Sequence, residues 1–229
     1  MFKDRRIKII IGHYGSGKTE FSVNYAINKA KETEEKIVLV DLDIVNLYFR
    51  SREKKELLKE LDIKLIGSSI DASALDLPSV SPEINRVFDD KSVNAILDIG
   101  GDSIGAKTLG RYKDYLVEGS YDMFYVINKN REATSTPENA IEYMRDIEGT
   151  SRAKVTGLVS NTHLLKSTSV EDILAGVELS KEVSQKTGIP IKYITVLRSL
   201  EDELRSKIGE EFKDKIFPID LYMREDWMI

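Results

Sequence analysis

Short apolar runs rich in β-branched residues alternate along this chain with amphipathic stretches at helical spacing. The apolar runs predict strands over residues 7–11, 36–41, 63–66, 93–98, 123–127, 155–159 and 191–197. Nearly continuous apolar strands are buried on both faces, and their alternation with helices is typical of a parallel sheet. The pattern therefore predicts an α/β fold of three layers, in which helices cover both faces of a mostly parallel central sheet.

Polar residues between these runs mark where helices begin and end. Proline follows a capping residue at Ser81–Pro82 and at Thr136–Pro137, which predicts a helix start at each. Thr168 and Glu171 have capping-box spacing, and the helix that they open is expected to end at Gly188. Further helices are expected over residues 18–33, 51–61 and 199–207, with a loop over 67–80.

A complete phosphate-binding motif, G-x-x-x-x-G-K-[ST], connects the first predicted strand to the first predicted helix. Its glycines let backbone N–H groups turn toward a phosphate, and the helix N-terminus adds unpaired donors. Lys18 can reach the outer phosphates, and the Thr19 hydroxyl can join the coordination shell of Mg²⁺. The sequence therefore predicts nucleotide binding by this loop and the residue after it: Gly12, His13, Tyr14, Gly15, Ser16, Gly17, Lys18, Thr19 and Glu20.

Acidic residues stand at the ends of two predicted strands, where open α/β sheets bind their ligands. Asp41 ends the second strand with Asp43 two residues on, and Asp98 ends another strand just before a Gly-Gly pair. Carboxylates here can hold Mg²⁺ or position an attacking water, so Thr19, Asp41 and Asp98 are the candidate metal ligands. The Gly101 N–H can approach the terminal phosphate. The alternatives are a helix cap for one of the first two acids and a simple turn at the glycines.

Two segments of the sequence indicate whether the bound nucleotide carries adenine or guanine. Residues 128–131 read Asn-Lys-Asn-Arg, whereas a guanine-reading loop of the form Asn-Lys-x-Asp needs an acid where Arg131 stands. Without that carboxylate the N1–H and N2 amine of guanine lose their paired acceptor, so the sequence favours adenine. Asn161 ends a predicted strand and is a candidate for hydrogen bonds to the adenine edge, or else a helix or turn cap.

Composition narrows the class of partner. The 229 residues carry a formal net charge of −5, two histidines and no cysteine. The charge gives no general attraction to nucleic acid or to an anionic membrane. The lack of cysteine excludes disulfides, thiolate nucleophiles and cysteine-bound metal centres. No apolar run reaches membrane-spanning length and no cleaved signal is expected, so the chain is expected in the cytoplasm as one domain over residues 1–229.

In this order the motifs resemble those of the CobQ/CobB/MinD/ParA family of P-loop ATPases, the deviant Walker ATPases of the SIMIBI class. The matching stretches are residues 12–19, 38–43, 97–101 and 159–161. The resemblance implies a P-loop NTPase fold, Mg²⁺-dependent ATP binding, slow hydrolysis and often a dimer that closes around ATP. By position it implies catalytic roles for Lys18 at the phosphates, Asp43 at the attacking water and Asp98 beside the metal.

One position departs from the family pattern. The family has a lysine directly after the first glycine of the loop, where this chain has His13, and Tyr14 follows in place of a glycine. A neutral imidazole lacks the fixed charge with which that lysine contacts phosphate across the dimer. Arg50, Arg52 and Arg131 are candidate replacements, and the sequence does not choose among them.

Two classes of function fit these features. The first is a slow ATPase whose ATP- or ADP-bound state controls docking to a partner protein, with a homodimer as one expected form. The alternative is a small-molecule enzyme that uses ATP, either a kinase or a CobQ/CobB-like amide-forming synthetase. Its substrate pocket is expected beside the γ-phosphate, lined by residues 68–81, Lys107, Arg111 and Tyr112. The absence of cysteine argues against a metal-cluster carrier, and the acidic segment 211–229 argues against membrane docking.

Overall fold

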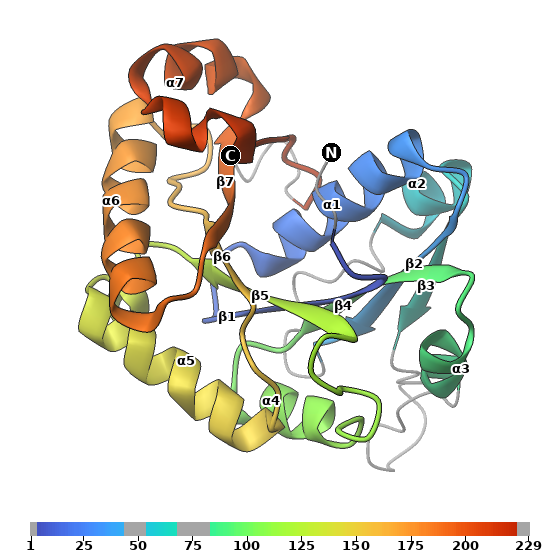
Figure 1. The fold of residues 1–229 in the computed structure, drawn as a ribbon. Coiled ribbons are helices and arrows are strands. Elements are labelled where there is room, and N and C mark those ends of the chain that lie inside the picture. Colours follow the sequence, from blue (N-terminus) through green and yellow to red (C-terminus); the bar gives the residue numbers. More distant parts are fainter. Residues whose placement is uncertain (1–3, 44–53, 68–82, 224–229) are drawn as a thin grey trace, which may run out of the picture.

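Eight strands form one parallel sheet in the computed structural model, which describes residues 4–43, 54–67 and 83–223 (Figure 1). The strand order across the sheet is β3-β2-β4-β1-β5-β6-β7-β8, and each neighbouring pair is parallel. The strands are β1 (Ile7–Gly12), β2 (Lys36–Leu42), β3 (Ile63–Gly67), β4 (Val93–Ile99), β5 (Tyr121–Ile127), β6 (Gly157–Ser160), β7 (Ile191–Leu197) and β8 (Ile216–Ile219).

The helices cover both faces of this sheet. They are α1 (Lys18–Glu32), α2 (Lys55–Glu60), α3 (Glu83–Asp89), α4 (Ser103–Gly110), α5 (Pro137–Ser151), α6 (Val170–Thr187) and α7 (Glu201–Lys207). In β1, Ile10 packs into a core with α1 and α2, whereas Ile9 packs into a second core with α3 to α7. Figure 1 shows α1 above the sheet and α4 and α5 below it. The predicted three-layer fold is confirmed.

Most predicted elements are present with small shifts of their boundaries, but one strand and one α-helix of the described residues were not predicted. β8 was missed because Pro218 interrupts its apolar run; a proline is tolerated here because β8 lies at the sheet edge. The short helix α4 was also missed. Of the helix expected over 51–61, the structure shows α2. The loop expected over 67–80, beyond residue 67, and the helix start expected at Ser81–Pro82 lie outside the described residues.

Helix ends follow the capping residues, with one correction. Thr136 accepts from the Asn139 N–H and Gly188 ends α6 with φ of 75°, as predicted. The capping box of α6 is shifted by one residue: Ser169 is the N-cap and Asp172 its partner, not Thr168 and Glu171. The Thr168 hydroxyl instead accepts from the Leu164 N–H at 2.8 Å, because the preceding loop folds back on it. Among the helices of the described ranges, none combines the length and apolar content needed to cross a membrane.

Candidate functional site

The loop between β1 and α1 has the backbone of a phosphate cradle. Gly15 and Gly17 adopt φ of 74° and 85°, in the left-handed region that favours glycine. A Cβ on Gly12 would lie 2.7 Å from the Val126 carbonyl oxygen, so the loop can approach β5 this closely only with glycine there. No side chain caps the N-terminus of α1, which begins at Lys18. Its first N–H groups are therefore available to an anion.

Lys18 and three aspartates meet at the carboxyl edge of the sheet. Asp41 on β2 is in register with Asp98 on β4. The Lys18 Nζ lies 3.3 Å from Asp43 Oδ2, and Asp41 Oδ1 accepts from the Asp43 N–H at 3.1 Å. All four residues are at most 4% exposed. The structure thus brings together the residues predicted to act on phosphate, water and metal.

Asp98 is the most perturbed acid of this group. Burial raises the pKa of Asp98 to about 7; Lys18 opposes the rise and Asp41 adds to it. Its Oδ1 accepts from the Ser22 hydroxyl at 3.3 Å, but Oδ2 has no hydrogen-bond partner among the described residues. A buried carboxylate oxygen without a partner is costly, and a cation would satisfy it.

The donor set fits Mg²⁺ that arrives with a nucleotide. Thr19, Asp41 and Asp98 offer oxygen ligands, and the buried Ser16 hydroxyl also lacks a hydrogen-bond partner in the described part of the chain. Across the described ranges no three Asp, Glu or His side chains form a complete metal cluster. Mg²⁺ usually binds through one or two carboxylates, water and phosphate oxygens, so this incomplete set suits it.

The Gly101 loop lies against the phosphate loop. A Cβ on Gly101 would lie 2.6 Å from the Gly12 carbonyl oxygen and 2.8 Å from the Tyr14 nitrogen. The Gly101 carbonyl accepts from the Tyr143 hydroxyl of α5 at 2.5 Å. The ring of His13 packs edge-on against the Tyr143 ring, with 5.2 Å between centroids. No sequence motif marked Tyr143, because its role depends on how α5 packs under the loop.

The segment after β5 braces the loop from the other side. The Arg131 Nε donates to the Gly15 carbonyl at 2.9 Å. Asn128 Oδ1 accepts from the Asn130 N–H at 3.0 Å, which closes a tight turn. Arg131 therefore stands beside the phosphate loop of its own chain. Arg50 and Arg52, the other candidate replacements for the family lysine, lie outside the described residues.

Asn161 also reaches the loop. Its Nδ2 donates to the Ser16 carbonyl at 2.6 Å, and its Oδ1 accepts from the Thr195 hydroxyl. The side chain is 2% exposed. These bonds join β6 and β7 to the phosphate loop, so Asn161 has a structural role in addition to the predicted contact with adenine, which stays a prediction.

A cavity of about 240 Å³ opens beside the loop and the first turn of α1. Its wall includes polar residues after β6, such as Thr162 and His163, and apolar residues near the C-terminus, such as Leu221 and Met223. The lining combines apolar side chains such as Ile219 and Leu221 with polar ones such as Asn161 and Thr195, and such a mixture beside a phosphate cradle suits a nucleoside.

One predicted site residue has further partners, and one sequence prediction needs correction. The Glu20 carboxylate accepts from the Tyr222 and Met223 N–H groups at 2.6 and 3.1 Å, while its expected contact with the nucleotide stays a prediction. Tyr112, expected in a substrate pocket, is buried in the core and stacks on Phe88 with 5.1 Å between ring centroids. Lys107 and Arg111 are exposed, and neither lines the cavity beside the loop. The rest of that expected pocket, residues 68–81, lies outside the described residues.

No protein-family model matches the chain, and no curated protein sequence matches it. Solved structures do match. The signal recognition particle receptor FtsY from Elizabethkingia anophelis is 17% identical with a TM-score of 0.50, covering 84% of this chain and 59% of that chain. The cell division protein FtsY from Thermotoga maritima is 21% identical with a TM-score of 0.53, covering 85% and 63%. A nucleotide-binding protein from Archaeoglobus fulgidus, solved with ADP, is 16% identical with a TM-score of 0.49, covering 95% and 93%.

At these identities the likeness concerns the fold. The chain has the three-layer α/β fold of the P-loop NTPases, which it shares with the FtsY structures. It spans less than two thirds of the length of those FtsY chains.

Proposed function

We propose that this protein binds Mg²⁺ and ATP, hydrolyses ATP slowly and acts as a nucleotide-controlled switch on a partner protein. The observation that carries the proposal is the meeting of a complete phosphate loop with Lys18, Asp41, Asp43 and Asp98 at one edge of the sheet. Buried charges of this kind are costly for the fold. Their presence is explained by a ligand with charges of both signs, such as a metal-bound triphosphate.

The phosphates are held by the loop backbone, the N-terminus of α1 and Lys18. Lys18 is paired with Asp43 at 3.3 Å, so a phosphate must share or replace that partner. When bound, Mg²⁺ neutralises charge on the phosphate oxygens, and Thr19, Asp41 and Asp98 are the residues that would hold it. Asp43 stands within reach of Lys18 and is the candidate that orients the attacking water.

The proposed preference for ATP rests on Arg131. The turn at Asn128 resembles the start of a guanine-reading loop, but Arg131 presents a cation where such a loop has an acid. A guanidinium has only donors, and the Watson–Crick edge of guanine presents donors at N1 and N2. Guanine is therefore disfavoured at this position. Competition between ATP and GTP for binding measures the preference directly.

The switch role is supported by the contact between the Gly101 loop and the phosphate loop. The Gly101 backbone lies next to Gly12 and Tyr14, where a terminal phosphate would be sensed. Tyr143 connects this contact to α5. A change at the γ-phosphate would thus move the Gly101 loop and, through Tyr143, helix α5 at the surface of the molecule. Position 13 is His13 and supplies no fixed charge, so dimerisation around ATP would depend on another cation.

The test compares molecular size in different nucleotide states. Asp43→Ala is expected to keep ATP bound and to stop hydrolysis, since it removes the water-orienting carboxylate but leaves Lys18. Size-exclusion chromatography with light scattering is then run with ADP and with ATP on this variant. A shift seen only with ATP supports the nucleotide-gated dimer. Lys18→Ala is the control that should bind neither nucleotide.

Other outcomes would contradict parts of the proposal. Full turnover by the Asp43→Ala variant would remove the role given to Asp43. A monomer in both nucleotide states, with turnover that depends on one metabolite and yields a phosphorylated or ligated product, would establish the alternative, an ATP-using small-molecule enzyme.

A further inference from the structure

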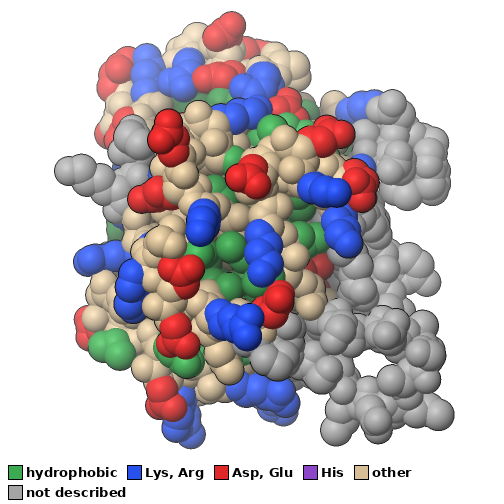
Figure 2. Space-filling view, turned by 90° about the vertical axis from the view of Figure 1, so that its right-hand side faces the viewer, with side chains coloured by type: hydrophobic (Ala, Val, Ile, Leu, Met, Phe, Trp, Pro, Cys, Tyr) green, Lys and Arg blue, Asp and Glu red, His purple; other side chains and the backbone are tan. Residues whose placement is uncertain are grey.

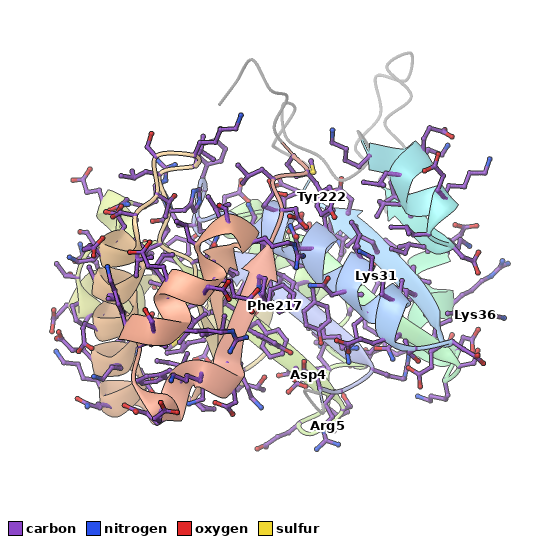
Figure 3. The ribbon with its side chains drawn as sticks, turned by 90° about the horizontal axis from the view of Figure 1, so that it is seen from above. Asp4, Arg5, Lys31, Lys36, Phe217 and Tyr222 are labelled. Carbon is purple, nitrogen blue, oxygen red and sulfur yellow. The ribbon has the colours of Figure 1, made fainter. Side chains whose placement is uncertain are left out.

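The C-terminal segment, residues 219–223, is fastened to α1 directly beside the phosphate loop. Glu20, in the first turn of α1, accepts from the Tyr222 N–H at 2.6 Å through Oε1 and from the Met223 N–H at 3.1 Å through Oε2. In the view of Figure 3, Tyr222 and Asp4 lie on opposite sides of Phe217 of β8. The segment thus continues from β8 to the loop edge of the sheet.

A second clamp lies one helical turn further along α1. Asn24 Oδ1 accepts from the Asp220 N–H at 2.8 Å, and its Nδ2 donates to the Asp220 carbonyl at 2.9 Å. One amide therefore binds both backbone groups of a single residue, as a neighbouring strand would. Asn24 is 2% exposed, so these bonds are shielded from water. The ion pair between Arg198 and Asp220, at 3.0 Å, is largely exposed and adds little.

The clamped segment forms one wall of the cavity beside the loop. Ile219, Leu221 and Met223 line that cavity, and Gly17, Lys18 and Thr19 line it from the loop side. Alternate residues of the segment face the cavity, as in an extended chain. Since Glu20 follows Thr19 directly, the wall and the phosphate site are joined through adjacent residues of one helix.

We propose that Glu20 and Asn24 are positioning residues that hold residues 219–223 as the apolar wall for the base and ribose of the nucleotide. This inference rests on the proposed function, because it assumes that the loop binds a nucleotide. The inference accounts for an acid next to a phosphate cradle, because the Glu20 oxygens accept hydrogen bonds from the backbone N–H groups of Tyr222 and Met223. The wall contributes affinity for the nucleoside, whereas the loop contributes affinity for the phosphates.

The experiment measures two ligands on the same protein by isothermal titration calorimetry with Mg²⁺ present. One ligand is ATP, and the other is tripolyphosphate, which has the phosphates without the nucleoside. Glu20→Ala is expected to weaken ATP binding about tenfold and to change tripolyphosphate binding by less than about twofold. Leu221→Ala keeps the hydrogen bonds of Glu20 and Asn24 but removes part of the apolar wall. It should therefore also weaken ATP binding.

Glu32→Ala is the matched control, since Glu32 is a half-exposed glutamate at the other end of α1. It should leave both affinities unchanged. Equal losses for ATP and tripolyphosphate in Glu20→Ala would overturn the proposal, because Glu20 would then act through the phosphate loop. Unchanged ATP binding in Glu20→Ala and Leu221→Ala would overturn it too. If Glu20→Ala does not fold, as judged by circular dichroism, Leu221→Ala decides. Failure of the unaltered protein to bind ATP would instead refute the proposed function itself.

Discussion

At the scale of single residues, the site is built from buried charges that compensate each other. Lys18 is 4% exposed, and its ammonium lies 3.3 Å from the Asp43 carboxylate. Removing one partner of a buried pair usually costs more than the pair contributes, because the other charge remains. A nucleotide would supply that second partner to Lys18, which is why we expect Asp43→Ala to retain ATP.

Lys8 is a buried charge that lies away from the site. It stands on β1, is 1% exposed, and its ammonium contacts the side-chain oxygen of Asn94 and lies 5.8 Å from the Tyr25 ring centre. Burial, with a smaller contribution from Lys29, lowers the pKa of Lys8 to about 8. In the unfolded chain the pKa of Lys8 has its ordinary value of 10.5. Below pH 8 the buried ammonium is therefore charged in the folded state, and this charge lowers the free energy of unfolding.

Lys8→Met is therefore expected to raise the free energy of unfolding at pH 7 by about 1–3 kcal/mol. Between pH 8 and 10 the folded wild-type protein releases this proton before the unfolded chain does, so wild-type stability rises relative to the variant. Denaturant unfolding of both proteins at pH 7, 8, 9 and 10 should show the difference shrinking. Lys36→Met, at an exposed lysine that points outward in Figure 3, is the control and should show little change. A difference that is constant with pH would contradict the assignment.

At the scale of elements, the contact between two glycine-containing loops organises the phosphate site. The first loop joins β1 to α1, and the second joins β4 to α4, where Asp102 caps the helix by accepting from the Gly105 N–H at 2.8 Å. The Gly101 backbone sits directly on the first loop. Glycine is required at Gly101 because any Cβ would meet backbone atoms of its neighbour, which cannot swing aside as a side chain does.

Gly101→Ala is accordingly expected to push the two loops apart and to lower ATP affinity and turnover at least about tenfold. Gly149→Ala is its matched control, since Gly149 lies on α5 with open space around the added methyl. That control should keep activity and gain about 0.5–1 kcal/mol of stability. Fluorescent-nucleotide titration and a phosphate-release assay measure the two effects. Normal turnover by Gly101→Ala would argue against a role for this contact.

At the scale of the whole molecule, an aromatic cluster connects α1 with three strands. It consists of Phe21 and Tyr25 on α1, Phe124 on β5, Tyr193 on β7 and Phe217 on β8. Phe217 stacks on Tyr25 at 6.0 Å between ring centroids and meets Tyr193 edge-on at 5.3 Å. Figure 2 shows charges of both signs interspersed over the visible face, without one dominant sign. Buried aromatic pairs in such geometries stabilise the fold beyond the area that they bury.

Phe217→Ala should remove about 3–5 kcal/mol from the free energy of unfolding, because Phe217 is 7% exposed and its loss leaves a cavity among rings. Urea unfolding followed by circular dichroism measures the change. Val117→Ala, at a residue that is 63% exposed, should change stability by less than about 0.5 kcal/mol. Equal effects of the two substitutions would show that β8 is not held by the cluster.

The phosphate loop and most strands and helices, in their order, could be predicted from the sequence itself; β8 and α4 could not. The predicted features depend on local spacing: apolar runs, capping residues and eight consecutive residues of one motif. Asp41, Asp43 and Asp98 were also identified correctly as neighbours of the loop, since parallel strands end at a common edge. The observed boundary differs from the predicted one where two neighbouring residues could both cap a helix, as Thr168 and Ser169 could at the start of α6.

Only the tertiary structure decided which distant residues meet. Glu20 binds the backbone of Tyr222, 202 positions away, and Tyr143 of α5 reaches the Gly101 loop. Tyr112 turned inward to the core although its sequence position suited a pocket. Such contacts have no local signature, because any helix or segment of suitable shape can provide them. They exist only once the sheet order has placed β8 and α5 beside the loop, and that order is set by packing across the whole chain.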